Sequence, residues 1–218
     1  MPNSLTKNNS RGCFITLEGM EGVGKSTHQA FIQRYLKQTG HAVVVTREPG
    51  GTPIAETIRQ LLLKRQAEVI IPETELLLLF AGRAQHIKHV IRPALNAGKW
   101  VICDRFTDAS YAYQGGGRGV SMQKIEALEK WVQADLRPDC ILLLDTRVKL
   151  ALKRIKRRGK LDRIETEEEE FFQRVRAAYL ARAEKFPGRY EIIEASAALL
   201  KIQRRIKLIL DKLINDRR

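Results

Sequence analysis

Eight residues near the N-terminus read Gly19-Met20-Glu21-Gly22-Val23-Gly24-Lys25-Ser26. They fit the pattern G-x-x-x-x-G-K-[ST], follow the apolar run Cys13–Leu17 and precede a helical pattern. A glycine-rich turn between a strand and a helix presents backbone N–H groups that surround a phosphate. Its lysine reaches the β- and γ-phosphate oxygens, and its hydroxyl is a ligand for Mg²⁺. The stretch therefore predicts a nucleotide-binding P-loop.

The rest of the chain alternates between aliphatic runs and helical patterns. Five runs are predicted as strands: Cys13–Glu18, Ala42–Thr46, Trp100–Asp104, Cys140–Asp145 and Tyr190–Ile193. The predicted helices are Ser26–Gln38, Ile54–Leu63, Glu73–Ala97, Met122–Gln133, Arg147–Arg157, Glu167–Lys185 and Ser196–Asn215. This alternation is typical of a parallel sheet with helices on both faces. We predict a three-layer α/β P-loop NTPase fold with a five-stranded parallel sheet.

Length and composition indicate one ordinary globular domain. The chain has 218 residues, of which 44% are hydrophobic and 29% charged, and no apolar run is long enough to cross a bilayer. The polar start has no apolar core of a secretory signal. We therefore expect a disordered tail over residues 1–11, a single domain over residues 12–218, and a cytoplasmic protein that binds no membrane.

Charge and cysteine usage narrow the classes of partner. Lys and Arg outnumber Asp and Glu by 39 to 25, a formal net charge of +14, which favours polyanions such as nucleotides or nucleic acid. The three cysteines lack metal-site spacing and are interpreted as buried thiols. They are Cys13, Cys103 and Cys140.

The four histidines are interpreted as helix-surface or loop residues without a catalytic partner. They are His28, His41, His86 and His89.

Charged residues follow four of the predicted strands. After the P-loop strand, the next strands lead into Arg47–Thr52 (REPGGT), Asp104-Arg105 and Asp145. Turn chemistry alone would explain any one of them. Because ligands of parallel sheets gather at the carboxyl ends of the strands, we predict that all four converge on one cleft.

Four motifs now resemble those of the bacterial thymidylate kinases, in the same order. They are Thr46–Thr52 (TREPGGT), Asp104–Phe106 (DRF), Ala112–Gly119 (AYQGGGRG) and Arg158–Arg163 (RGKLDR). The resemblance runs from about Phe14 to the C-terminus. It implies an enzyme that transfers the γ-phosphoryl group of ATP to dTMP with Mg²⁺, giving dTDP and ADP, and that forms homodimers.

The residue types fit phosphoryl transfer between two anions. An acceptor phosphate is already ionised near neutral pH, since its second pKa is about 6, so no general base is needed. We expect Lys25 to bridge the ATP phosphates, and Ser26 to hold Mg²⁺ with Asp104 through water. Arg105, helped by Arg47, is expected to grip the acceptor phosphate, because guanidinium groups match phosphate oxygens.

Further roles come from the resemblance alone. It implies that Glu21 binds the deoxyribose 3′-hydroxyl and that Arg83 and Gln114 address the thymine edge, with Ser110 nearby. From spacing alone, Arg83 is a surface helix charge and Gln114 a polar loop residue. The expected ATP site is Gly19, Met20, Glu21, Gly22, Val23, Gly24, Lys25, Ser26 and Arg154. The expected dTMP site is Glu21, Arg47, Glu48, Pro49, Phe80, Arg83, Asp104, Arg105, Ser110, Tyr113 and Gln114.

A dense basic stretch, Lys153–Arg163, precedes four glutamates. Such a run is usually a solvated face, but here it resembles the family's lid, expected at about residues 153–170, which closes over ATP and supplies a catalytic arginine. In one branch of the family the P-loop carries that arginine; here the matching residue is Gly22. We expect Arg158 to serve, assisted by Arg154 and Arg163; such an arginine is worth about 10³–10⁵ in rate.

Three positions depart from the family pattern. Leu79 stands where relatives often have the phenylalanine that stacks on thymine, and we expect Phe80, on a similar helix face, to take that role. Ala109 replaces a frequent serine, and Lys160 replaces a frequent glutamate.

Two alternatives remain open at this point. Another nucleoside monophosphate kinase shares the phosphate machinery and differs only in the base pocket. A nucleic-acid-linked P-loop protein would use the positive charge, but aromatic residues are only 6% of the chain and no stacking platform appears, so we expect no nucleic acid partner. The apolar stretch Leu76–Phe80, with later aliphatic residues, exceeds one core face and favours a homodimer.

Overall fold

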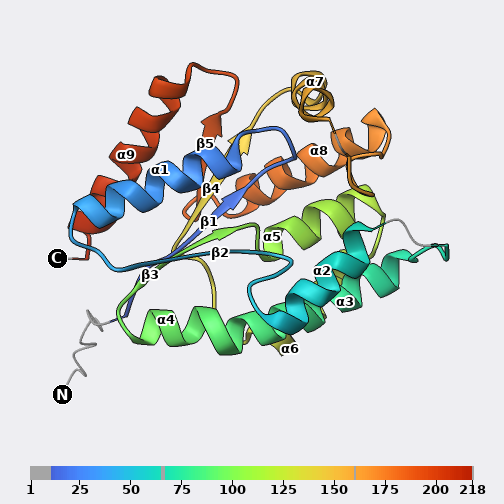
Figure 1. The fold of residues 1–218 in the computed structure, drawn as a ribbon, viewed down its shortest axis with the longest axis horizontal. Helices are drawn as coiled ribbons and strands as arrows, with labels where there is room; N and C mark the ends of the chain where they lie inside the picture. Colours follow the sequence, from blue (N-terminus) through green and yellow to red (C-terminus); the bar gives the residue numbers. More distant parts are fainter. Residues whose placement is uncertain (1–10, 65–66, 160, 218) are drawn as a thin grey trace.

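The computed structural model describes residues 11–64, 67–159 and 161–217. A five-stranded sheet runs through its centre in the order β2-β3-β1-β4-β5 (Figure 1), and all four strand pairs are parallel. The strands are β1 (Phe14–Glu18), β2 (Val43–Arg47), β3 (Trp100–Asp104), β4 (Cys140–Asp145) and β5 (Tyr190–Glu194). The predicted fold class and all five strands are confirmed, with boundaries within one residue of those expected.

Helices lie on both sides of the sheet (Figure 1). They are α1 (Lys25–Gln38), α2 (Pro53–Leu63), α3 (Pro72–His86), α4 (Arg92–Asn96), α5 (Thr107–Ser110), α6 (Met122–Gln133), α7 (Val148–Arg158), α8 (Glu169–Lys185) and α9 (Leu199–Asn215). Two π-helical segments, η1 (Ile87–Ile91) and η2 (Tyr111–Gly117), continue α3 and α5. The single helix predicted over Glu73–Ala97 is therefore α3, η1 and α4 in succession.

Strand β1 explains why the sheet needs cover on both faces. All five of its side chains are buried, and alternate residues point to opposite faces. Ile15 and Leu17 pack in a cluster with Ile32 and Leu36 of α1. Phe14 packs in a second cluster with residues of η1 and α4. The end of β1, and the loop after it, are thus fixed from both sides.

Segment η2 is helical although its glycines favour a loop in isolation. A Cβ on Gly116 would lie 2.6 Å from Cβ of Ala178, and one on Gly117 would lie 2.5 Å from the ring of Phe171. Both neighbours belong to α8. The glycines therefore let α8 approach η2 closely, and this tertiary packing outweighs the low helix propensity.

Three expectations concern the chain as a whole. Residues 1–10 of the predicted tail lie outside the described residues. Within the described part, no helix is long and apolar enough to span a membrane. The three cysteines are buried free thiols, as predicted.

Candidate functional site

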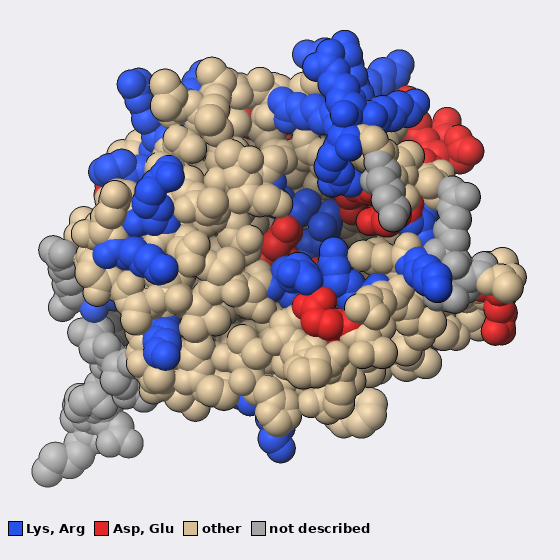
Figure 2. Space-filling model, in the orientation of Figure 1, with Lys and Arg blue, Asp and Glu red and all other residues tan. Residues whose placement is uncertain are grey.

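A cleft of about 540 Å³ lies at the carboxyl ends of β1, β2 and β3. In Figure 2 it is the hollow near the middle of the face, where basic and acidic side chains meet. The predicted residues that line it are Glu21, Gly22, Gly24, Lys25, Ser26, Glu48, Pro49, Arg83, Asp104, Arg105, Ser110, Tyr113, Gln114, Arg158 and Arg163. Most of the predicted site is therefore in one place.

The P-loop joins β1 to α1 and directs Lys25 back over its own backbone. Lys25 Nζ donates to the carbonyls of Gly19 and Met20 at 3.1 and 2.7 Å. Burial, and next the charge of Arg105, lower the pKa of Lys25 to about 8, against the opposing effect of nearby carboxylates. An anion placed at this loop would relieve that cost, because it favours the charged lysine. The side chains of Met20 and Val23 are buried in the hydrophobic core. In the P-loop, these two residues therefore present only their backbone to a ligand.

Arg105 directly follows β3, and its side chain lines the cleft. Its backbone has φ 67°, the left-handed region that non-glycine residues rarely adopt. Its Nη2 donates to Glu21 Oε1 at 2.7 Å and contacts the Tyr113 hydroxyl at 2.9 Å. Tyr113 in turn donates to Glu21 Oε2 at 2.7 Å. Burial alone would lower the pKa of Arg105, but Tyr113 and the carboxylates of Glu21 and Asp104 hold it well above its usual value.

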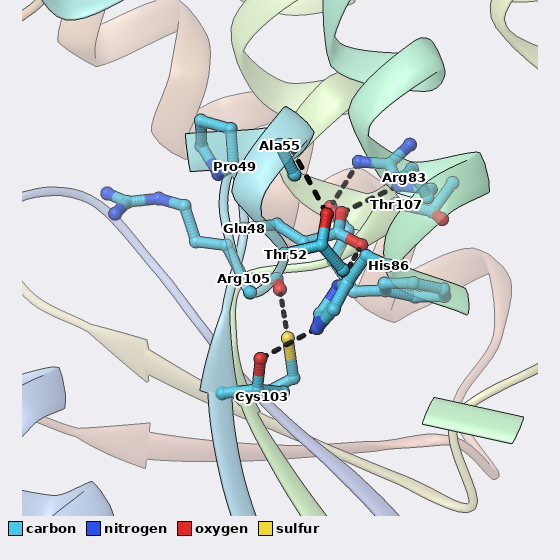
Figure 3. A network of polar contacts seen from close by, with 12 residues as sticks. Glu48, Pro49, Thr52, Ala55, Arg83, His86, Cys103, Arg105 and Thr107 are labelled. Carbon is cyan, nitrogen blue, oxygen red and sulfur yellow. Dashed lines mark hydrogen bonds and ion pairs between the residues drawn. The ribbon is translucent and has the colours of Figure 1, made fainter. Parts of the chain in front are cut away.

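Arg83 and Glu48, which also line the cleft, form a buried ion pair (Figure 3). Arg83 Nε donates to Glu48 Oε2 at 2.7 Å, and Arg83 Nη2 donates to Ser110 Oγ and the Phe106 carbonyl at 3.0 and 3.2 Å. Burial by itself raises the pKa of Glu48, but Arg83 and His86 outweigh it and lower the pKa. Arg83 is only 2% exposed, so the surface reading from spacing is wrong.

Two histidines also differ from the surface positions expected of them. His86 is fully buried and His28 is 3% exposed. His86 makes a polar contact with Glu48. His28 lies in α1, where burial lowers its pKa. Helical spacing alone could not reveal this, because it depends on which elements pack against α3 and α1.

Gln114 lies in η2 and is buried, so it is not a polar loop residue. Its Nε2 donates to Glu75 Oε1 of α3 at 2.7 Å. Glu75 also pairs with Arg163, from the segment between α7 and α8, and with Arg118 at 3.5 Å. The predicted base-reading amide is therefore tied to the predicted lid through one carboxylate.

Asp104 and Ser26 have the donor atoms expected of a Mg²⁺ site. Its Oδ1 is buried and has no hydrogen-bond partner among the described residues, and both side chains line the same cleft. The described residues contain no group of three or more His, Cys, Asp or Glu side chains that could hold a metal. Mg²⁺ is typically bound through one or two carboxylates, substrate phosphates and water, so the donors present fit this ion.

The predicted lid arginines occupy three different settings. Arg158, at the end of α7, lines the cleft and pairs with Glu165. Arg163 Nε donates to the Leu62 carbonyl at the end of α2, at 2.7 Å. Arg154 Nη1 donates to the carbonyls of Ala195 and Gly22 at 3.1 and 3.4 Å, beside the P-loop and not on the cleft wall. Lys160 lies outside the described residues.

Three predictions about the cleft are wrong. Phe80 is 2% exposed and packs with Leu76 and other apolar residues, whereas Leu79 lines the cleft. Arg47 pairs with Glu56 at 2.8 Å and is not on the cleft wall. Asp145, at the end of β4, is engaged by Arg176 at 2.7 Å. The convergence of strand ends holds for β1, β2 and β3.

Arg59 is the clearest residue that sequence reasoning missed. It lines the cleft from α2 and donates to the Pro49 carbonyl at 3.0 Å. Burial, and then the nearby charges of Arg47 and Arg105, lower its pKa. No motif contains it, and its only signal is its place in the helix after the REPGGT turn.

Comparisons with known proteins agree with one another. A profile of the family described as thymidylate kinase matches residues 17–206. The "Thymidylate kinase" of Pseudomonas fluorescens (strain Pf0-1) is 55% identical over 203 residues, covering 93% of this chain and 97% of that relative. The one from Pseudomonas savastanoi pv. phaseolicola is 53% identical over 207 residues, covering 95% and 99%. The crystal structure of thymidylate kinase from Ehrlichia chaffeensis has a TM-score of 0.75 at 32% identity, covering 92% of this chain and 99% of its own.

Proposed function

Because this chain belongs to the thymidylate kinase family, an enzyme family that phosphorylates dTMP, we propose that it transfers the γ-phosphoryl group of ATP to dTMP with Mg²⁺. The products are dTDP and ADP. The observation that carries the proposal is that one cleft gathers three cationic side chains: Lys25 of the P-loop, Arg105, which donates to the same Gly19 carbonyl as Lys25, and Arg59 of α2. Such a cleft brings two phosphate groups together.

The transfer is a direct in-line displacement. An ionised oxygen of the dTMP phosphate attacks the γ-phosphorus, the new O–P bond forms, and the bond to the β,γ-bridging oxygen breaks as ADP leaves. No residue needs to remove a proton, since the second phosphate pKa is about 6. The protein's task is to align the groups and to stabilise the spreading negative charge.

Each end of the cleft has a defined task. At the donor end, Lys25 and the P-loop N–H groups hold the ATP phosphates, and Arg158 and Arg154 add positive charge from the lid. At the acceptor end, Arg105 and Arg59 hold the dTMP phosphate, with Arg59 in the role that the sequence suggested for Arg47. Ser26 and Asp104 would hold Mg²⁺, which supplies neutralisation of the phosphate charge when bound.

The acceptor's sugar and base have matching partners. Glu21 accepts from Arg105 and Tyr113 and is proposed to accept also from the 3′-hydroxyl. Arg83 and Gln114 address the thymine edge, with Ser110 beside Arg83. The nitrogen Nη1 of Arg83 has no hydrogen-bond partner among the described residues, so a donor is available to a base carbonyl. Leu79 packs against the ring in place of a phenylalanine.

A coupled ADP-release assay with ATP and Mg²⁺ tests the proposal. The acceptors are dTMP, dUMP, UMP, CMP, AMP and GMP, and the variants are Arg105→Ala and the outward Arg47→Ala as its matched control. We expect turnover that depends on dTMP and on Mg²⁺, is lost on adding EDTA, and falls at least about a hundredfold in R105A. Turnover with another monophosphate but not with dTMP would contradict the proposed acceptor. Equal losses in both variants would contradict the role of Arg105.

We also propose that two copies of the chain associate. Leu76 and Phe80 are used inside the chain, but Leu77 of α3 is 57% exposed, and Trp131 of α6, a helix in contact with α3, is 81% exposed. Large exposed apolar side chains on adjacent helices mark association surfaces. Light scattering at micromolar concentration measures the mass, and a monomer would end this part of the proposal.

A further inference from the structure

His86 is buried at the end of α3 and has a polar partner on each ring nitrogen. Its Nδ1 lies 2.9 Å from Glu48 Oε1, and its Nε2 lies 2.6 Å from Thr46 Oγ1. The same Glu48 carboxylate binds Arg83 through its other oxygen. Figure 3 shows Arg83 and His86 turned toward Glu48 from neighbouring positions. Glu48 is thus held between two side chains of one helix.

The hydrogen-bond directions can be assigned from chemistry. A carboxylate only accepts, and the lowered pKa of Glu48 keeps this group ionised at neutral pH. The Nδ1 of His86 therefore carries a proton and donates to Glu48. The hydroxyl of Thr46 either donates to or accepts from Nε2, so it anchors the ring whichever form Nε2 takes.

The ring also fits the turn that carries Glu48. A Cβ added to Gly51, at φ 88°, would lie 2.6 Å from the His86 ring. The His86 ring therefore lies directly beneath Gly51, in the turn that follows β2. Substituting His86 would therefore disturb both this turn and the Glu48 carboxylate. Among the described residues, His86 makes no hydrogen bond to the P-loop.

Arg83 is fixed on several sides by this arrangement. Its guanidinium carbon lies 4.5 Å from the centre of the Phe80 ring and 5.3 Å from that of Phe106. The rings fix the plane of the guanidinium, and the bond to Glu48 fixes its position along that plane. The direction of the free Nη1 is then set by the bond to Glu48 together with those to Ser110 and the Phe106 carbonyl, so a displaced Glu48 would turn it.

We propose that His86 is a positioning residue for base recognition: it orients Glu48, which in turn orients Arg83 toward the acceptor's base. The inference rests on the proposed function, since it assigns His86 to the dTMP end of the cleft. Its contribution should appear in the KM for dTMP and leave the KM for ATP unchanged, because its hydrogen-bond partners in the described part of the chain are Glu48 and Thr46, and neither of them bonds to Lys25 or to the described lid residues.

Two substitutions separate the two ring nitrogens. The amide nitrogen of His86→Asn takes the place of Nδ1 and retains a donor to Glu48, whereas that of His86→Gln takes the place of Nε2 and retains only the contact with Thr46. We expect H86Q to raise the KM for dTMP about tenfold, the effect of losing one hydrogen bond to a charged group. H86N should stay within about twofold of the wild type, and the KM for ATP should not change in either variant.

The outcomes are distinct. A wild-type protein that does not phosphorylate dTMP would defeat the proposed function, and with it this inference. An active wild type with equal KM values for dTMP in H86N and H86Q would overturn the inference alone, because the ring would then act only by its volume. A rise in the KM for ATP equal to that for dTMP would overturn it as well.

A milder variant covers the case in which both substitutions at position 86 prevent folding. Thr46→Val keeps the size of the side chain and removes only the hydroxyl that anchors Nε2. We expect a rise of about threefold in the KM for dTMP, consistent with a weaker, indirect effect of one neutral hydrogen bond. An unchanged KM for dTMP in T46V would overturn the inference.

Discussion

The two ends of the cleft hold their cations in different ways. At the P-loop, the hydrogen-bond partners of Lys25 among the described residues are backbone carbonyls, and its pKa is lowered to about 8. At the base-reading end, Arg83 is paired with Glu48, and Glu48 is held by His86. Lys25 thus forms no ion pair with the described residues, whereas Arg83 is already fixed by a carboxylate.

This difference matches two kinds of recognition. A phosphate brings its own negative charge, so a cation without a carboxylate partner gains most when the anion arrives. A base edge is neutral and is read by the direction of a few hydrogen bonds, so the arginine that reads it must be held beforehand. In the proposed function, the donor end would therefore bind its ligand mainly through charge, and the acceptor end would orient its ligand through hydrogen bonds.

The largest expected effect is that of Lys25→Met. We expect kcat to fall at least about a thousandfold, because charge stabilisation of the transferring group is lost. The variant should also melt at a higher temperature at pH 7, since a lysine with its pKa lowered from 10.5 to about 8 destabilises the folded state. The unfolded state binds more protons between these values, so this advantage is complete below about pH 8 and disappears as the pH rises toward 10.5.

Steady-state kinetics and thermal melts at pH 7 and 10.5 measure both effects. The exposed Lys37→Met, on the same helix, is the matched control and should change neither. A lower melting temperature for K25M at pH 7 would show that the two ends do not differ in this way.

The next effect is that of Arg158→Met. Arg158 lines the cleft but is engaged by Glu165, so its charge must be released to reach ATP. We expect kcat to fall about a hundredfold with little change in the KM for dTMP. The neighbouring Arg157→Met, which lines a different groove of α7, is the control; if both variants lose the same activity, the effect belongs to the overall charge of α7.

A smaller effect distinguishes Leu79 from Phe80. Leu79→Ala should raise the KM for dTMP about tenfold, the effect of removing a partly buried apolar contact, and leave stability nearly unchanged. Phe80→Ala should instead lower the free energy of unfolding by about 3–5 kcal/mol, because it leaves a cavity in the core. Denaturant titrations beside dTMP kinetics measure both; the opposite pattern would restore Phe80 as the stacking residue.

The smallest effect concerns Glu18, the last residue of β1. Burial, and then the charge of Asp108, raise its pKa from 4.5 to about 8, although bonds from Tyr179 and the Phe106 N–H oppose the rise. A group with a raised folded pKa stabilises fully below its unfolded value and loses that contribution as the pH rises toward about 8. We expect the melting temperature of the wild type to fall between pH 5 and 8 more than that of Glu18→Gln. Parallel curves would show that Glu18 keeps an ordinary pKa.

The motifs predicted most of the site because each is short and continuous. Five residues of the P-loop, Glu48 and Pro49 of the REPGGT turn, Asp104-Arg105 and Gln114 line the cleft, and the predicted membership of the thymidylate kinase family is confirmed. Backbone turns of this kind are set by residues next to one another, and the carboxyl ends of parallel strands meet at one edge.

The errors share a physical cause. On α3, Glu75, Leu79 and Arg83 are four residues apart and form a row along the cleft, whereas Phe80 packs toward η2 and α6. Helical spacing alone cannot tell which of two adjacent rows faces the cleft, because that depends on the elements that pack against α3. Arg47 and Arg59 show the same limit: Arg47 of the motif pairs with Glu56, whereas Arg59, which no motif contains, lines the cleft.

The sequence by itself determined the parallel sheet, the P-loop and the family, since hydrophobic period and turn chemistry are local properties. Only the tertiary structure decided which row of α3 faces the cleft, that His86 is buried behind Glu48, and that Glu75 joins Gln114 to Arg163. These contacts depend on how distant helices rotate against one another as they pack, and many side chains jointly set that rotation.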